Sequence, residues 1–228
     1  MAAKAPANMK GPNGMSCLRV ARPHAIIAMP PMAASANPAK PPAMSSRQLG
    51  QASSIPVLAT QQVLLRDAVE TDVPVFGICL GGQLLAGALG GEVRPAGEPE
   101  RGWLEIAPSD SARDDPIFGI LERATGVYTW HDDVFDPPPG SRVLASTPAA
   151  PNQAFRIDGT DAWGIQFHPE TTPALWELWM ARHPREVEEA GVDVEAMRRE
   201  VYAGSERSHS FRAGLFDAFI NRVRSRYE

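Results

Sequence analysis

The sequence predicts an α/β fold with a mostly parallel central sheet flanked by helices. Residues 73–78 form a short apolar run typical of a strand that is buried on both faces. Residues 80–89 combine helix formers with an apolar face and end at two glycines, which is typical of a helix C-terminus. A second apolar run, Trp163–Phe167, predicts another buried strand. At 228 residues the chain can hold one such domain with a sizeable core.

The remaining elements are predicted from hydrophobic spacing. We expect helices at 61–71 and 173–181 and further strands at 103–107, 127–130, 142–146 and 154–157. The charged tail, 192–227, favours helix and carries an apolar stripe at every fourth residue: Phe211, Leu215, Phe219 and Val223. Such a stripe favours covering the main domain over docking a partner.

Cys79 lies on the predicted turn between the first strand and its helix. Gly77 and Gly81 flank it, as a sharp turn with little room for side chains requires. The nucleophile elbow has this form with a serine in place of the cysteine. A helix N-terminus stabilises a thiolate, and the Leu80 N–H would face an oxyanion formed on an attacked carbonyl. Taken alone, the motif also suits a buried, inert cysteine.

His168 follows the second apolar run, with Glu170 two residues later. Pro169 ends the strand, and Glu170 falls on the same side of the extended chain as His168. A cysteine nucleophile needs a base of this kind, because the imidazole carries the proton while the carboxylate fixes its tautomer and stabilises the imidazolium. Taken alone, a His-x-Glu sequence equally suits a surface loop.

The two motifs together, GICLGGQ at 77–83 and QFHPE at 166–170, resemble those of the class I glutamine amidotransferase family. Over about residues 55–175 the order and spacing are similar to those of the glutaminase domain of GMP synthetases and its stand-alone relatives. The resemblance implies a flavodoxin-like fold. It also implies a catalytic triad of Cys79, His168 and Glu170, with the Leu80 N–H in the oxyanion hole.

The resemblance further implies two substrate contacts. Gln83, one helical turn after Cys79, would hydrogen-bond the amino-acid end of the substrate, and Asp133 would contact its α-amino group from a polar loop. The alternatives are a core-facing helix residue at Gln83 and a solvated acidic loop at Asp133. The sequence at 130–133, WHDD, departs from the Ser-His-Gly-Asp common in the family, so the pocket shape and the substrate stay open.

Composition limits the compartment and the partners. Cys17 and Cys79 are the two cysteines; they build no disulfide framework or metal-binding spacing, which favours a cytoplasmic protein without a metal or cofactor. The net charge of −5 argues against nucleic acid as a partner. No apolar run is long enough to span a membrane.

A break in residue usage predicts three parts: an atypical segment 1–52, an amidotransferase domain 55–182 and a C-terminal helical extension 183–228. Residues 1–66 hold no acidic residue, whereas all 27 acidic residues follow from 67 onward. The first strands and the Gly-Gly-Pro-like oxyanion loop of the family are not recognisable in 1–52, although 24–29 could form a strand. We expect this segment to be disordered or to be replacement sequence, such as a shifted reading frame; a transit peptide is the alternative.

The predicted reaction is hydrolysis of the glutamine carboxamide through a Cys79 thioester. The sequence has no Ser-Gly-Gly-x-Asp run and no Walker loop, so the ammonia would pass to a separate partner such as a synthetase. One alternative is a γ-glutamyl peptide hydrolase. Another is an impaired or non-enzymatic binding subunit, because loss of one oxyanion donor costs ~10²–10³ in rate. A metal site at Cys79, His168 and Glu170 lacks the Pro-Cys-x-x-Cys partner of zinc deaminases.

Overall fold

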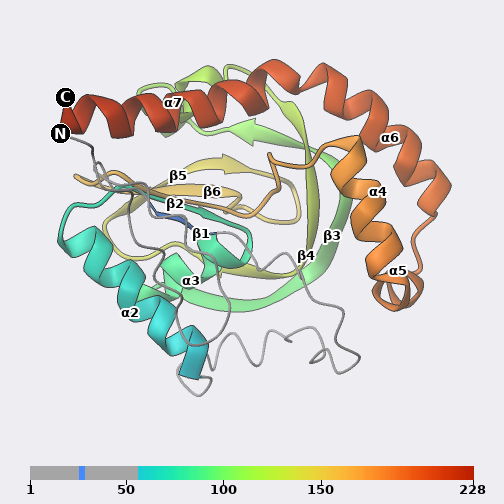
Figure 1. Cartoon of the computed structure of the whole chain (residues 1–228), viewed down its shortest axis with the longest axis horizontal. Coiled ribbons are helices and arrows are strands. Elements are labelled where there is room, and N and C mark those ends of the chain that lie inside the picture. The colour runs from blue at the N-terminus through green and yellow to red at the C-terminus, as the bar shows by residue number, and fades with distance from the viewer. Residues whose placement is uncertain (1–25, 29–55) are drawn as a thin grey trace, which may run out of the picture.

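The computed structural model describes residues 26–28 and 56–228, which form an α/β fold (Figure 1). Within these residues one sheet of seven strands has the order β1-β2-β7-β6-β5-β3-β4. The strands are β1 (Ile26–Ala28), β2 (Val75–Ile78), β3 (Glu92–Pro108), β4 (Thr125–Asp136), β5 (Ser141–Ser146), β6 (Ala154–Ile157) and β7 (Ala162–Ile165). The expected α/β class is confirmed.

Strand direction explains how distant motifs meet. β1–β2 and β2–β7 pair in parallel, whereas the pairs from β7 through β6, β5 and β3 to β4 are antiparallel. The sequence predicted a mostly parallel sheet. The structure shows parallel pairing at β1–β2–β7 and antiparallel pairing in the rest of the sheet. In the β2–β7 register Ile78 pairs with Ile165, so Cys79 and the segment that follows β7 leave the sheet at the same edge.

Two apolar layers enclose the sheet. On one face, α2 (Pro56–Glu70) and α3 (Leu80–Ala88) pack with residues such as Leu65, Leu85 and Phe155. On the other face, α7 (His209–Tyr227) lies along the sheet and buries its predicted apolar stripe against Phe76 and Trp163 (Figure 1). The stripe thus covers the main domain, as predicted.

The three remaining helices pack beside the β3–β4 hairpin. They are α4 (Pro173–Arg182), α5 (Pro184–Ala190) and α6 (Val194–Arg207), preceded in the chain by two short 3-10 turns, Asp110–Ala112 and Phe118–Ile120. Trp176, Met197 and Val201 form a buried cluster with Tyr128 of β4. Thr172 caps α4 by accepting a hydrogen bond from the Leu175 N–H at 3.2 Å. None of the helices in residues 56–228 is long and apolar enough to cross a membrane.

His131 and Asp133 do not lie in a polar loop; they belong to β4, because β3 pairs with it as far as Asp136 (Pro95 opposite Asp133, Glu100 opposite His131). The run 24–29 contributes the short strand β1. The rest of the atypical segment 1–52, with Cys17, lies outside the described residues, and the expected domain boundaries stay predictions.

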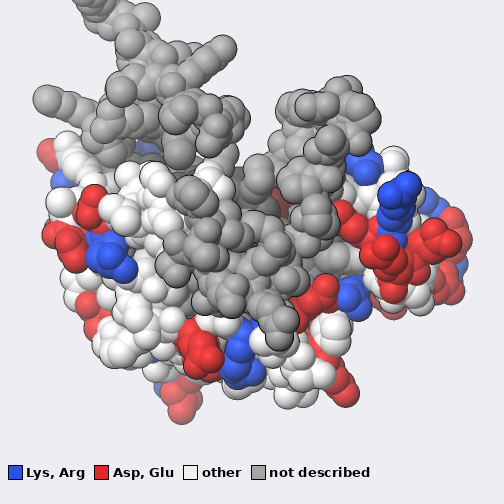
Figure 2. Space-filling view, turned by 90° about the horizontal axis from the view of Figure 1, so that it is seen from below, with Lys and Arg blue, Asp and Glu red and all other residues white. Residues whose placement is uncertain are grey.

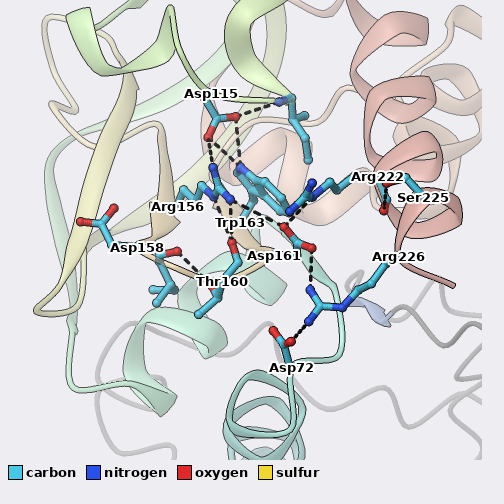
Figure 3. A network of polar contacts seen from close by, with 12 residues as sticks. Asp72, Asp115, Arg156, Asp158, Thr160, Asp161, Trp163, Arg222, Ser225 and Arg226 are labelled. Atoms are coloured by element: carbon cyan, nitrogen blue, oxygen red, sulfur yellow. Dashed lines mark hydrogen bonds and ion pairs between the residues drawn. The ribbon is translucent and has the colours of Figure 1, made fainter.

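A polar network fastens α7 to the sheet end opposite Cys79 (Figure 3). Asp161, 3% exposed just before β7, accepts hydrogen bonds from Arg222 at 2.8 Å and Arg226 at 2.7 Å. Arg156 lies 3.6 Å from the same carboxylate and stacks over Trp163, 4.8 Å from the ring centroid. Each arginine of this network already pairs with a carboxylate, which indicates a structural role.

Candidate active site

Cys79 occupies the sharp turn between β2 and α3 with a backbone φ of 51°. A positive φ is rare for a residue with a side chain and stores strain, and such strain collects at functional sites. Two backbone hydrogen bonds hold the turn: the Cys79 N–H donates to Ile165 O at 2.8 Å, and the Gln83 N–H donates to Cys79 O at 3.0 Å. The cysteine is thus fixed relative to both central strands.

Glycine at 77 and 82 lets α3 approach the sheet backbone. A Cβ at Gly77 would lie 2.6 Å from Gly81 O, and one at Gly82 would lie 2.6 Å from Ile165 O. Real Cβ atoms do not come this close to backbone oxygens. The expected lack of room is confirmed at Gly77 and extends to Gly82. The expectation for Gly81 stays a prediction.

His168 and Glu170 form a tight pair at the same edge of the sheet. His168 Nδ1 lies 2.7 Å from Glu170 Oε1, and the His168 N–H donates to Tyr128 O at 2.8 Å. Burial lowers the pKa of His168, but the electrostatic interaction with Cys79, followed by that with Glu170, outweighs burial and raises this pKa well above its ordinary value. The structure therefore brings together all three residues of the predicted triad.

Two glutamine side chains connect Cys79 to β4 by hydrogen bonds. Gln166 Nε2 donates to Cys79 Sγ at 3.6 Å, while Gln83 Nε2 donates to Gln166 Oε1 at 3.2 Å and to Asp133 O at 3.3 Å. Sequence reasoning missed Gln166, although it stands two residues before His168 in the QFHPE motif, directly after β7. Gln83 is 3% exposed and its amide nitrogen bonds within the protein; its contact with substrate stays a prediction.

A cavity of about 360 Å³ opens beside Cys79. It includes the predicted Leu80, Gln83 and Asp133; His168 and Glu170 are not among its lining residues. The full lining is Cys79, Leu80, Gln83, Arg101, Trp130, His131, Asp132, Asp133, Glu186, Glu189 and Ala190. Helix α5 thus contributes to the wall, which the sequence did not predict.

The buried carboxylate of Glu100 contacts His131, one of the residues that line this cavity. Glu100, 5% exposed, lies 3.1 Å from His131 Nε2 and accepts hydrogen bonds from Thr147 and Gln153. Burial raises the pKa of Glu100, but the contacts with His131, Thr147 and Gln153 outweigh it and lower this pKa. Glu100 therefore stays ionised and fixes β4 next to Asp133.

Arg212 of α7 holds the loop that carries Glu170. Its guanidinium donates to Thr171 O at 2.7 Å and Pro169 O at 3.1 Å, and also to Ser205. Burial lowers the pKa of Arg212, and the Glu170 charge partly offsets this effect. Within residues 26–28 and 56–228, no group of three or more His, Cys, Asp or Glu side chains is arranged to hold a metal ion.

Comparison with known proteins identifies the family. The family model for class I glutamine amidotransferases matches residues 53–182, more than half of the chain. The chain belongs to the class I glutamine amidotransferase family. Within this family it is similar to a subunit of the glutamine-hydrolyzing GMP synthase of Saccharolobus solfataricus, with 44% identity over 44% of this chain and 53% of that protein. The corresponding subunit of Sulfolobus acidocaldarius is 43% identical over 43% of this chain and 52% of its own.

This amidotransferase chain spans about half the length of the curated relatives it matches. Solved structures match a larger part of this chain. A glutamine amidotransferase from Thermotoga maritima superposes with a TM-score of 0.67 at 25% identity, over 79% of this chain and 74% of that one. One from Methylobacillus flagellatus gives a TM-score of 0.64 at 28% identity, over 72% and 68%.

Proposed function

We propose that this amidotransferase hydrolyses the side-chain carboxamide of glutamine, or of a γ-glutamyl compound, through a thioester on Cys79. The observation that carries the proposal is the set of side chains at the carboxyl ends of β2 and β7. There a strained cysteine at a helix N-terminus acts electrostatically on His168, and Glu170 Oε1 lies 2.7 Å from His168 Nδ1. A nucleophile, a base and a carboxylate that orients the base are what acyl transfer from an amide requires.

Each residue has a distinct proposed role. Cys79 attacks the carbonyl carbon, and the Leu80 N–H, the first of α3, stabilises the oxyanion. His168, whose raised pKa favours the imidazolium, donates the proton that the poor amine leaving group needs and then activates water. Glu170 orients His168, while Gln83 and Asp133 bind the amino-acid end of the substrate.

Similarity to these GMP synthase subunits supports a role as the glutamine-hydrolysing component of a two-component enzyme. In that role ammonia would pass to a separate synthetase or other acceptor protein. The relatives support a glutamine substrate most directly, whereas the cytoplasmic location rests on the cysteine content alone.

The deciding experiment compares purified protein with Cys79→Ala for the release of ammonia and glutamate from glutamine. We expect release from the wild type and background values from the variant, with circular dichroism showing that both are folded. Equal background release from both folded proteins would reject hydrolysis by this chain and favour the alternative of a binding subunit.

One observation also favours the γ-glutamyl hydrolase alternative. The cavity of about 360 Å³ falls in the range that holds drug-sized ligands, ~300–1,000 Å³, which are larger than glutamine. Measuring glutamate release from γ-glutamyl dipeptides beside glutamine separates the two substrates.

A further inference from the structure

Helix α4 places the indole of Trp179 beside the imidazole of His168. The two ring centroids lie 6.5 Å apart, and the ring planes are tilted by 46°. Trp179 is partly buried against an apolar cluster that includes Tyr128 and Trp176. Acidic and basic side chains are interspersed on the surface at this end of the molecule, where α5 and α6 lie (Figure 2). Apolar packing therefore holds the ring that lies next to the proposed catalytic base.

The contact with Glu170 does not by itself fix the plane of the imidazole. Glu170 Oε1 lies 2.7 Å from one atom of the ring, His168 Nδ1. The terminal torsion of a histidine side chain has broad energy minima, so a ring held at one atom can still turn and carry its other nitrogen, Nε2, to a new place. Two rings packed against the imidazole limit this rotation, that of Trp179 and that of Tyr128, whose centroid lies 6.4 Å away. The orientation of His168 thus depends on aromatic packing as well as on a carboxylate.

Trp179 is itself held by three further rings. Its centroid lies 5.1 Å from that of Trp130, with 80° between the planes, and 6.1 Å from that of Tyr128, with 84° between the planes. The ring of His183 lies 5.9 Å away, and the His183 N–H donates to Trp179 O at 3.1 Å. Edge-to-face aromatic pairs stabilise one arrangement of the rings beyond what burial contributes. These neighbours therefore fix the orientation of the Trp179 indole.

Trp130 connects these rings to the cavity beside Cys79. Trp130 lines that cavity, whereas His168 is not among its lining residues. Trp179 contacts both Trp130 and His168. One side chain thus relates the position of the proposed base to that of the cavity wall.

We propose that Trp179 is a positioning residue, which keeps the His168 imidazole in the plane from which it exchanges protons during hydrolysis. This inference rests on the proposed function. Trp179 does not line the cavity, so it acts through His168 rather than on the substrate. Its loss should therefore slow the chemical steps and leave substrate binding intact. Misplacing a reacting group by about 1 Å costs up to ~10²-fold in rate.

Two replacements of Trp179 test this role, with glutamate release from glutamine by the full chain giving kcat and KM. Trp179→Leu removes the flat ring and should lower kcat about tenfold, while KM changes less than about threefold. Trp179→Phe keeps an aromatic ring and should retain about a third or more of the wild-type kcat. An unchanged kcat in Trp179→Leu, or equal losses of kcat in both variants, overturns the inference.

The pKa of His168 gives a readout that packing alone would not move. The interactions with Cys79 and Glu170 outweigh burial and raise this pKa. An imidazole that turns away from both neighbours and toward water returns to its ordinary value, ~6.5, so the pKa should fall in Trp179→Leu. Titration by NMR measures the fall, and the limb of the kcat/KM profile that reports His168 should move to lower pH. A pKa that stays the same or rises contradicts the positioning role.

Trp103→Leu is the matched control for stability. Trp103 is another partly buried indole of the same apolar cluster, and the glycine at 204 lets it pack against α6. Its replacement should lower the urea midpoint about as much as Trp179→Leu does, yet leave kcat per folded molecule and the pKa of His168 unchanged. Equal falls in kcat from both replacements would show a general effect of packing and reject the positioning role. If Trp179→Leu does not fold, Trp179→Met takes its place, because the flexible methionine side chain fills irregular space.

The NMR titration keeps this inference separate from the proposed function. If the wild type releases no glutamate, the proposed function fails, and the titration still decides whether Trp179 places the imidazole. This placement stands when the pKa of His168 falls in Trp179→Leu and not in Trp103→Leu. It is rejected when the pKa is the same in the wild type and both variants.

Discussion

The guanidinium of Arg212 on α7 donates a hydrogen bond to the carbonyl oxygen of Thr171 at 2.7 Å. The same side chain also donates to Pro169 O, so α7 holds the residues on both sides of Glu170. Helix α7 follows the segment matched by the family model, yet it holds the loop whose Glu170 carboxylate lies 2.7 Å from His168 Nδ1. Stability and site geometry are therefore coupled through one buried arginine.

Replacing Arg212 with methionine should destabilise the fold by about 2–4 kcal/mol, because several buried carbonyl groups lose their donor. Urea unfolding measures this change. Arg224→Met, at an exposed position on the same helix, is the matched control and should change stability by less than about 0.5 kcal/mol. Equal midpoints for the two variants would show that the contacts of Arg212 contribute little.

The pKa of His168 should fall when either charged neighbour is removed. It should fall further in Cys79→Ala than in Glu170→Gln, because Cys79 is the stronger of the two charges that raise it. Titration of the imidazole by NMR in the wild type and both variants measures the shifts. His183→Gln, which leaves His168 in place, provides the assignment control. A His168 pKa that is the same in all proteins would contradict this electrostatic account.

The contact between His168 and Glu170 also predicts how the free energy of unfolding changes with pH. Because the folded pKa of His168 is raised, its contribution to the free energy of unfolding is fully present below the unfolded pKa, ~6.5. It is lost as the pH rises through the folded pKa. The stability difference between wild type and Glu170→Gln, measured by urea unfolding, should therefore be larger at about pH 6 than at about pH 9. A difference that grows with pH would show that the sign is wrong.

The strain at Cys79 predicts that glycine is the more stable replacement. With φ at 51°, Cys79→Gly should be more stable than Cys79→Ala by about 1 kcal/mol, since glycine adopts a positive φ without steric cost. Neither variant can form a thioester. Ala203→Gly, at an exposed position in α6, should show the opposite sign and lose about 1 kcal/mol. Thermal or urea unfolding of the four proteins decides the comparison.

Local pattern was enough to predict the elbow, because a buried strand, a cysteine between glycines and a helix are all encoded within residues 73–91. The segment from His168 to Glu170 could also be placed, because it directly follows a predicted buried strand. Pattern was not enough for β4 at His131 and Asp133, where pairing with β3 overrides a polar sequence. Glu100 and Arg212 could not be predicted either, since the partners of Glu100 and the two loop carbonyl groups that Arg212 binds lie about 30 to 50 residues away in the chain.

The close approach of α3 to the sheet predicts the cost of a single methyl group. Gly82→Ala would place a Cβ 2.6 Å from Ile165 O, the atom that also accepts the Cys79 N–H, so α3 and the cysteine must shift together. We expect a loss of about 1–3 kcal/mol in stability and a fall in glutamine hydrolysis larger than the unfolded fraction accounts for. Gly97→Ala, whose Cβ would meet nothing within 4 Å, should leave both unchanged. If Gly82→Ala keeps full activity per folded molecule, the geometry of the cysteine turn does not depend on this contact.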